Sequence, residues 1–151
     1  MKALLKILAA TVCGLVLGLS AALAGDIPIY RFINVGTTGD DLTIHPGDLT
    51  LQVGETYRFV VSNPSKKIHV VAAPELAPTV RTAELRIEGR RLDVVAPRLD
   101  MVTGITLQPG QMIEWTFTPL EEGAYKFGCD DPVHAAAGMH AMIEVATQEV
   151  L

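Results

Sequence analysis

Apolar and polar side chains alternate along most of this chain, and that alternation restricts it to β-structure. Glycine, proline and asparagine interrupt the alternating runs at intervals of roughly 8–12 residues. Successive side chains of a strand point to opposite faces, so each run predicts a half-buried strand. The clearest runs are Ile29–Val35; Leu49, Leu51 and Val53; Tyr57, Phe59 and Val61; Ile105 and Leu107; and Ile113, Trp115 and Phe117. The pattern predicts an all-β sandwich or small barrel.

The segment from Glu75 to Val102 is the least regular part of the chain. Ala83, Leu85 and Ile87 alternate with charged neighbours, and the glycine at position 89 favours a turn. We expect an inserted hairpin around residues 79–95. A short helix from Thr79 to Ile87 is the alternative, because the same residues also fit a helical segment.

Residues 1–24 have the three parts of a secretory signal peptide. Two lysines precede an apolar run from Ile7 to Leu19, and small residues end at Ala24. A membrane-spanning helix needs about 20 apolar residues, so a retained anchor is the less favoured alternative. We expect cleavage after Ala24, one domain over residues 25–151, and a periplasmic or otherwise exported protein without membrane contact.

Charge and cysteine content limit the partners and the chemistry. The whole chain has a formal charge of −5, and the signal segment contains lysines but no acid, so the mature chain is more acidic still. This balance argues against nucleic acid as a partner. Cys13 lies in the signal segment, which leaves Cys129 alone in the mature chain and excludes a disulfide framework. A free thiol in an oxidising compartment is open to oxidation unless it binds a ligand.

Three side chains that bind soft metals lie close together near the C-terminus. Cys129, His134 and Met139 share one short loop, in which a proline and a glycine favour a tight turn. A further imidazole, His69, follows an earlier strand. Two histidines, one cysteine and a weakly bound methionine form the trigonal-plus-axial donor set of a blue-copper site.

Simpler interpretations of these residues remain open. Cys129 is also compatible with a buried thiol, Met139 with core packing, and His69 with a surface position. Their combination favours ligands over those alternatives. We expect Met112 and Met142 to lie in the core.

The other polar residues near the proposed site have less specific roles. His140 directly follows Met139, so on a strand its side chain should point away from the site. His45 precedes Pro46 in an expected surface turn. Asn63 is a candidate brace for the ligand loops through backbone hydrogen bonds, although ordinary turn chemistry also explains it.

The segment from Gly123 to Cys129, continued by Pro132, His134, Gly138 and Met139, resembles the C-terminal motif of the cupredoxins. This is the plastocyanin, azurin and auracyanin family of small copper proteins. Gly54–Asn63 with His69, and Pro109–Phe117, resemble further strands of that family, so the likeness covers about Leu49 to Val145.

The resemblance implies a Greek-key β-sandwich that holds one type 1 copper ion on His69, Cys129, His134 and Met139. The Cys-x4-His-x4-Met spacing is like that of bacterial cupredoxins, whereas plastocyanins have a shorter first gap.

We therefore expect an exported, monomeric one-electron carrier that is not an enzyme. Its partners would be redox proteins such as a c-type cytochrome or an oxidase. Val133 and the alanines after His134 form an apolar surface suited to weak docking. A Cys129–His134 nucleophile pair is less favoured, because it leaves His69 and Met139 without roles.

Copper handling is the alternative function. A periplasmic chaperone, storage or resistance protein would use the same ligands, but the methionine-rich or histidine-rich runs frequent in such proteins are absent from this sequence. A structural domain that has lost its metal would need a broken ligand set, and all four candidate ligands are present.

Overall fold

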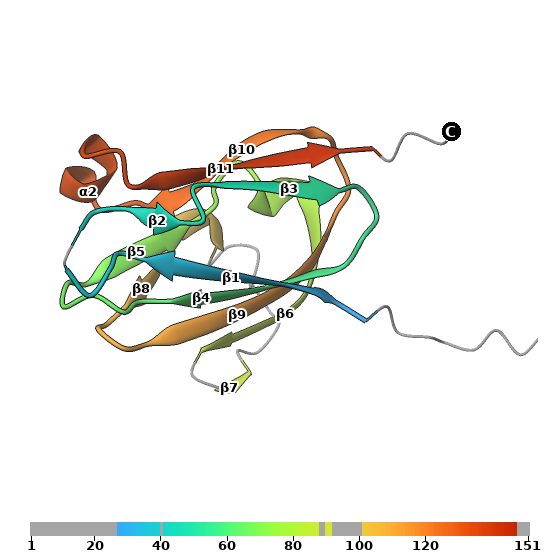
Figure 1. Cartoon of the computed structure of the whole chain (residues 1–151). Helices are drawn as coiled ribbons and strands as arrows, with labels where there is room; N and C mark the ends of the chain where they lie inside the picture. Colours follow the sequence, from blue (N-terminus) through green and yellow to red (C-terminus); the bar gives the residue numbers. More distant parts are fainter. Residues whose placement is uncertain (1–26, 40, 88–89, 92–100, 148–151) are drawn as a thin grey trace, which may run out of the picture.

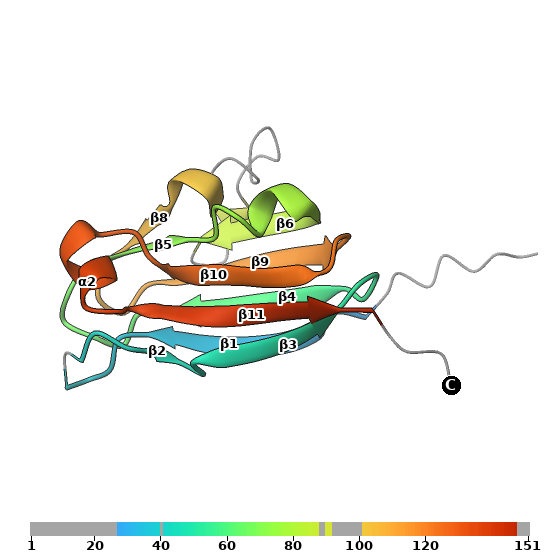
Figure 2. The ribbon, with the colours of Figure 1, turned by 90° about the horizontal axis from the view of Figure 1, so that it is seen from above.

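The computed structural model describes residues 27–39, 41–87, 90–91 and 101–147 of the 151-residue chain. The predicted signal peptide at residues 1–24 lies outside these ranges. Figures 1 and 2 show two β-sheets packed face to face. The strands are β1 (Ile29–Val35), β2 (Ile44–His45), β3 (Asp48–Gln52), β4 (Tyr57–Ser62), β5 (His69–Ala72), β6 (Val80–Ile87), β7 (Arg90–Arg91), β8 (Ile105–Leu107), β9 (Met112–Pro119), β10 (Gly123–Cys129) and β11 (His140–Ala146).

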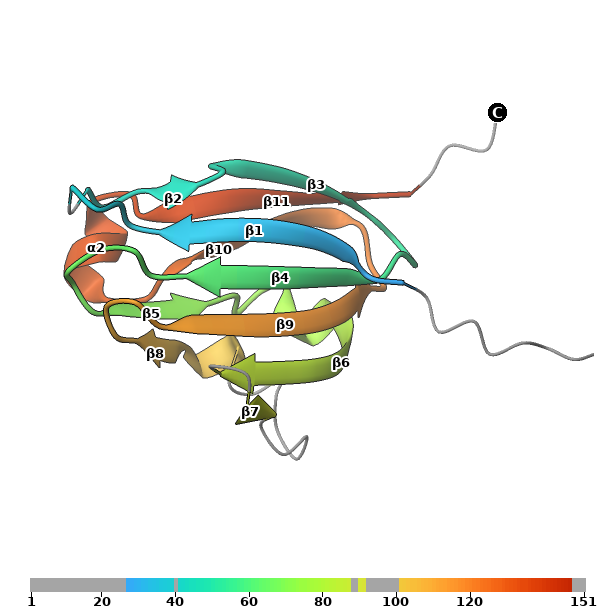
Figure 3. The ribbon, with the colours of Figure 1, turned by 60° about the horizontal axis from the view of Figure 1, so that its bottom comes forward.

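The chain passes repeatedly from one sheet to the other. The six-stranded sheet has the order β2-β1-β4-β9-β6-β7, and the five-stranded sheet has the order β3-β11-β10-β5-β8. Figure 3 shows β1, β4, β9 and β6 side by side in the first sheet. The pairs β1–β4 and β3–β11 are parallel, and the other pairs are antiparallel. The expected all-β sandwich is confirmed.

The core lies between the sheets and is richest in aromatic side chains around Phe59. This residue pairs with Trp115 in the β4–β9 register, and its ring meets that of Phe117 edge to face at 4.9 Å. Phe127 of the opposite sheet also meets the Phe59 ring edge to face, at 5.9 Å. All four side chains are fully buried, so one aromatic cluster joins both sheets.

The described helices are short. The 3-10 helix η1 (Ala77–Thr79) precedes β6, residues 101–103 form a helical segment, and α2 (Pro132–Ala136) lies between β10 and β11. Within the described ranges, no helix combines the length and the apolar character needed to cross a bilayer.

The irregular segment after residue 75 contributes a strand to the six-stranded sheet. β6 pairs with β9 from Val80 to Ile87, and β6 and β7 form the expected hairpin. The alternative helix over Thr79 to Ile87 is wrong, because Val80 and Leu85 face the core from a strand. Residues 88–89, where the sequence predicts the turn, and residues 92–95 of the predicted insert lie outside the described residues.

The expected core positions of Met112 and Met142 are also wrong. Each side chain is 38% exposed. Ile113 and Ile143, the next residues on their strands, are fully buried, so both methionines point outward by alternation.

Candidate metal centre

His69, Cys129 and His134 meet at one end of the sandwich. β5 and β10 are antiparallel neighbours with Val71 opposite Cys129, which places the first residue of β5 beside the last residue of β10. α2 follows directly and carries His134 at the same end (Figure 1). Residues sixty positions apart therefore become neighbours through strand pairing.

The three donor atoms are close enough to share one ion. His69 Nδ1 lies 3.2 Å from His134 Nδ1, and Cys129 Sγ lies 3.8 Å from the first nitrogen and 3.5 Å from the second. A point equidistant from the three atoms is about 2 Å from each, close to the length of a metal–imidazole bond. No large movement is needed to admit a metal.

The donors differ in their access to solvent. His69 and Met139 are fully buried and Cys129 is 5% exposed, whereas His134 is partly exposed. The backbone N–H of Val70 donates to Cys129 Sγ at 3.4 Å. His134 is therefore the donor nearest the surface, as expected.

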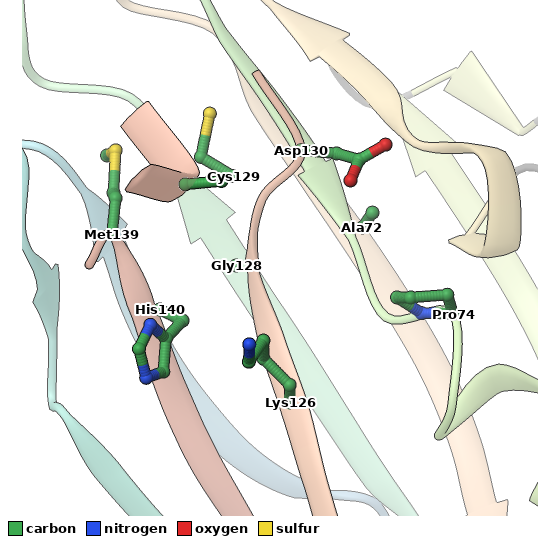
Figure 4. Close-up of a pocket in the computed structure, with 9 residues that line it drawn as sticks. Ala72, Pro74, Lys126, Gly128, Cys129, Asp130, Met139 and His140 are labelled. Atoms are coloured by element: carbon green, nitrogen blue, oxygen red, sulfur yellow. The ribbon is translucent and has the colours of Figure 1, made fainter. Parts of the chain in front are cut away.

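The backbone of Met139 forms hydrogen bonds with two residues of the same cluster. Its N–H donates to the His134 carbonyl at 3.1 Å, and its own carbonyl accepts from the Cys129 N–H at 3.0 Å. Figure 4 shows the side chain of Met139, which directly precedes β11, and that of Cys129 at the end of β10, with both sulfur atoms directed toward the same end of the sheet. The Met139 backbone is thus hydrogen-bonded to two residues of the cluster, Cys129 and His134.

Asp131 begins the short helix that carries His134, a role that the sequence analysis missed. Its carboxylate accepts from the N–H groups of Val133 at 3.0 Å and His134 at 3.1 Å. The hydrogen bond from His134 is the main cause that lowers the pKa of Asp131, opposed by desolvation and aided by the bond from Val133. An Asp before a Pro at the first helical position is an N-cap signal that the sequence contains.

We expect Asp131→Asn to change how the free energy of unfolding of the metal-free protein depends on pH. Because the folded-state pKa of Asp131 is lowered, its carboxylate stabilises the fold above its ordinary pKa, and this contribution disappears as the pH falls through the lowered value. Asparagine also caps helices but does not titrate. Urea unfolding should show similar stability at pH 7 and a smaller acid-induced loss in the variant. An identical acid dependence in both proteins would refute this role.

The other predicted polar residues lie around the cluster. Asn63 is buried, and its amide donates to the carbonyls of Lys67 at 2.8 Å and Leu107 at 3.0 Å, so it makes the expected backbone hydrogen bonds. His140 is exposed and lines a surface pocket of about 140 Å³ with Lys126 (Figure 4). His45 is exposed and contacts the hydroxyl of Thr43.

The two-sheet fold and the two-histidine, one-cysteine cluster with an adjacent methionine define a small β-sandwich that fits a type 1 copper site. Residues 32–146 match the family described as copper binding proteins, plastocyanin/azurin family. The match covers most of the chain, so the protein belongs to this family, the cupredoxins, and its cofactor is copper.

Solved structures with the same fold include both small and large copper proteins. Reduced auracyanin from Roseiflexus castenholzii is 24% identical, with a TM-score of 0.53 over 81% of this chain and 99% of that one. A multicopper oxidase from Campylobacter jejuni is 14% identical, with a TM-score of 0.57 over 80% of this chain and 30% of that one. Copper nitrite reductase from Nitrosomonas europaea is 12% identical, with a TM-score of 0.53 over 80% of this chain and 49% of that one.

The chain thus spans about a third of the multicopper oxidase and about half of the nitrite reductase. At these identities the likenesses show a shared fold. No curated protein sequence matches the chain.

Proposed function

We propose that this protein is an exported one-electron carrier whose copper is held by His69, Cys129, His134 and Met139. The observation that carries the proposal is the convergence of three donor atoms within 3.8 Å of one another, with one imidazole reaching the surface. Copper supplies a centre that cycles between Cu(I) and Cu(II). The chain supplies the donors and controls access to them.

Rapid electron transfer requires donors that move little between the two oxidation states. Cys129 ends a strand that pairs with β5 and β11, and His69 begins β5 in a fully buried position. The Val70 N–H holds the sulfur from one side. This rigid frame supports a donor geometry acceptable to both Cu(I) and Cu(II).

The surface around His134 is suited to brief contact with another protein. Val133 is 72% exposed, and the alanines at 135–137 are exposed as well. Small apolar contacts are typical of short-lived redox encounters. We propose that an electron enters or leaves through this surface, with a c-type cytochrome or an oxidase as the partner.

Salt should weaken the encounter with a basic partner. The net charge of the chain is negative, and exposed Glu121 and Glu122 precede β10 at the end opposite Cys129. Attraction by the whole molecule would speed the approach of a basic cytochrome at low ionic strength. Stopped-flow association rates should fall as salt rises. A rate that stays level or increases with salt would exclude this steering.

The two carboxylates at the remote end offer a control for that measurement. The double variant Glu121→Gln, Glu122→Gln lowers the negative charge without touching the donor cluster. Its association rate should be lower at low salt and should approach the wild-type rate at high salt.

Electron transport and copper handling predict different behaviour of the loaded protein. We expect Cu(II) to produce intense thiolate-to-copper absorption that ascorbate bleaches, followed by repeated reoxidation by an acceptor with copper retained. A colourless protein that binds only Cu(I), or one that releases copper to an apo-protein faster than it passes electrons, would instead support a chaperone or store. Spectrophotometry combined with copper analysis of the separated proteins decides between them.

We also propose that the chain is not itself an oxidase or reductase. The described residues bring together one cluster of three His, Cys, Asp or Glu side chains that fits a metal.

A further inference from the structure

The second ring nitrogen of His69 faces a buried serine. His69 Nε2 lies 2.9 Å from Ser65 Oγ, and the Ser65 side chain is almost fully buried. We propose that Ser65 is a positioning residue that fixes the tautomer and the orientation of His69. Its oxygen accepts a hydrogen bond from Nε2–H, which leaves the lone pair of Nδ1 directed at Cys129 and His134. The inference rests on the proposed role of His69 as a ligand.

The surrounding hydrogen bonds determine the direction of this contact. The amide NH2 of Asn63 donates to two backbone carbonyls, so its oxygen faces Ser65 as an acceptor at 2.8 Å. The other polar oxygen near the hydroxyl is the Lys67 carbonyl, at 3.2 Å, which also only accepts. In the proposed arrangement the single hydroxyl proton of Ser65 goes to the Asn63 oxygen, which is the nearer of these two acceptors. One lone pair of the Ser65 oxygen accepts from the Lys67 N–H at 3.1 Å, and the other remains for the proton on His69 Nε2.

The backbone at Gly36 also approaches His69 and Ser65 closely. Gly36 follows β1 with φ of +79°, and a Cβ placed on it would lie 2.9 Å from His69 Nε2 and 2.9 Å from Ser65 Cβ. Only glycine combines this backbone conformation with so close an approach. The backbone at Gly36 therefore closes the side of the imidazole that faces away from the donors.

The result is a difference between the two imidazoles. His69 contacts Ser65, which Asn63 holds in turn, and Gly36 lies beside the ring, so Nδ1 of His69 is preorganised before a metal arrives. His134 lies in a five-residue helix and is partly exposed. Partners of a ligand's second nitrogen raise its basicity and fix its orientation, and their loss typically lowers metal affinity about 10- to 100-fold.

Ser65→Ala tests this inference, with Ser62→Ala as the matched control. Ser62 is a nearby serine whose hydroxyl donates to the Asn34 side chain at 2.6 Å. Competition with a chromophoric chelator for Cu(I) should show about 10- to 100-fold weaker binding for Ser65→Ala and wild-type binding for the control. Equal affinity in the Ser65→Ala and wild-type proteins would overturn the proposal.

A second measurement does not depend on copper or on the folding of a variant. Nitrogen-15 NMR of the metal-free wild-type protein should show a proton on His69 Nε2 that is protected from exchange with water. A proton on Nδ1 instead would overturn the proposal. This readout also separates the two claims, because a wild-type protein that carries no electrons can still show the Nε2–H tautomer.

Discussion

Replacing Cys129 with serine should abolish the intense visible absorption of the copper-loaded protein. That absorption arises from charge transfer between a thiolate and copper, and Cys129 is the single cysteine outside the predicted signal peptide. A serine oxygen is a hard donor and is a poor ligand for Cu(I). We therefore also expect the affinity for Cu(I) to fall by several orders of magnitude, the largest functional effect of any single change in this chain.

Two controls separate the loss of the ligand from the loss of the fold. The side chain of Cys129 is small and buried, and a serine oxygen can still accept from the Val70 N–H, so thermal unfolding of the metal-free variant should remain cooperative. Met139→Leu removes the axial thioether but keeps the thiolate, so intense absorption should persist while the reduction potential shifts. A Cys129→Ser protein that retains the colour would show that the ligand assignment is wrong.

Phe59→Ala should produce the largest loss of stability. The ring is fully buried and contacts aromatic rings of its own sheet and of the opposite one. Truncating a buried phenylalanine leaves a cavity and costs about 3–5 kcal/mol, which is a large part of the stability of a typical domain. Urea unfolding of the metal-free protein should show this decrease in the free energy of unfolding.

Phe32→Ala is the matched control, because it removes the same side chain from the outer face of the six-stranded sheet. Phe32 is 71% exposed on β1, so its replacement should change the free energy of unfolding by no more than about 0.5 kcal/mol. Similar losses in the two variants would mean that the aromatic cluster is not the centre of the core. The comparison is independent of copper and tests the fold alone.

Alternation predicts the fold well wherever one face of a strand is buried. Tyr57, Phe59 and Val61 share one parity, and all three are buried. Residue type alone predicts core positions for Met112 and Met142, whereas their parity places them on the outer face. Parity along the strand is the better guide here because the strand geometry, and not the hydrophobicity of one residue, decides which way a side chain points.

The metal site was predictable to the extent that its residues are neighbours in sequence. Cys129, His134 and Met139 lie within one loop, and their spacing alone suggests a shared metal. The approach of His69 depends on the pairing of β5 with β10, which a single sequence does not reveal without a family resemblance.

The residues that support the ligands are harder still to identify without a three-dimensional structure. Ser65 contacts His69 and Gly36 lies beside its ring, from two different loops, and nothing in their local sequence indicates a neighbouring imidazole. Asp131 is the exception, because an aspartate followed by proline is a helix-start signal that sequence alone provides.

X-ray absorption at the copper edge, recorded on the same protein in its Cu(II) and Cu(I) states, tests the account most directly. We predict two imidazole nitrogens and one short sulfur around the metal in both states, with bond lengths that change little on reduction. A first shell without sulfur, or one that loses or gains a strong ligand on reduction, would contradict a preformed electron-transfer site built on His69, Cys129 and His134.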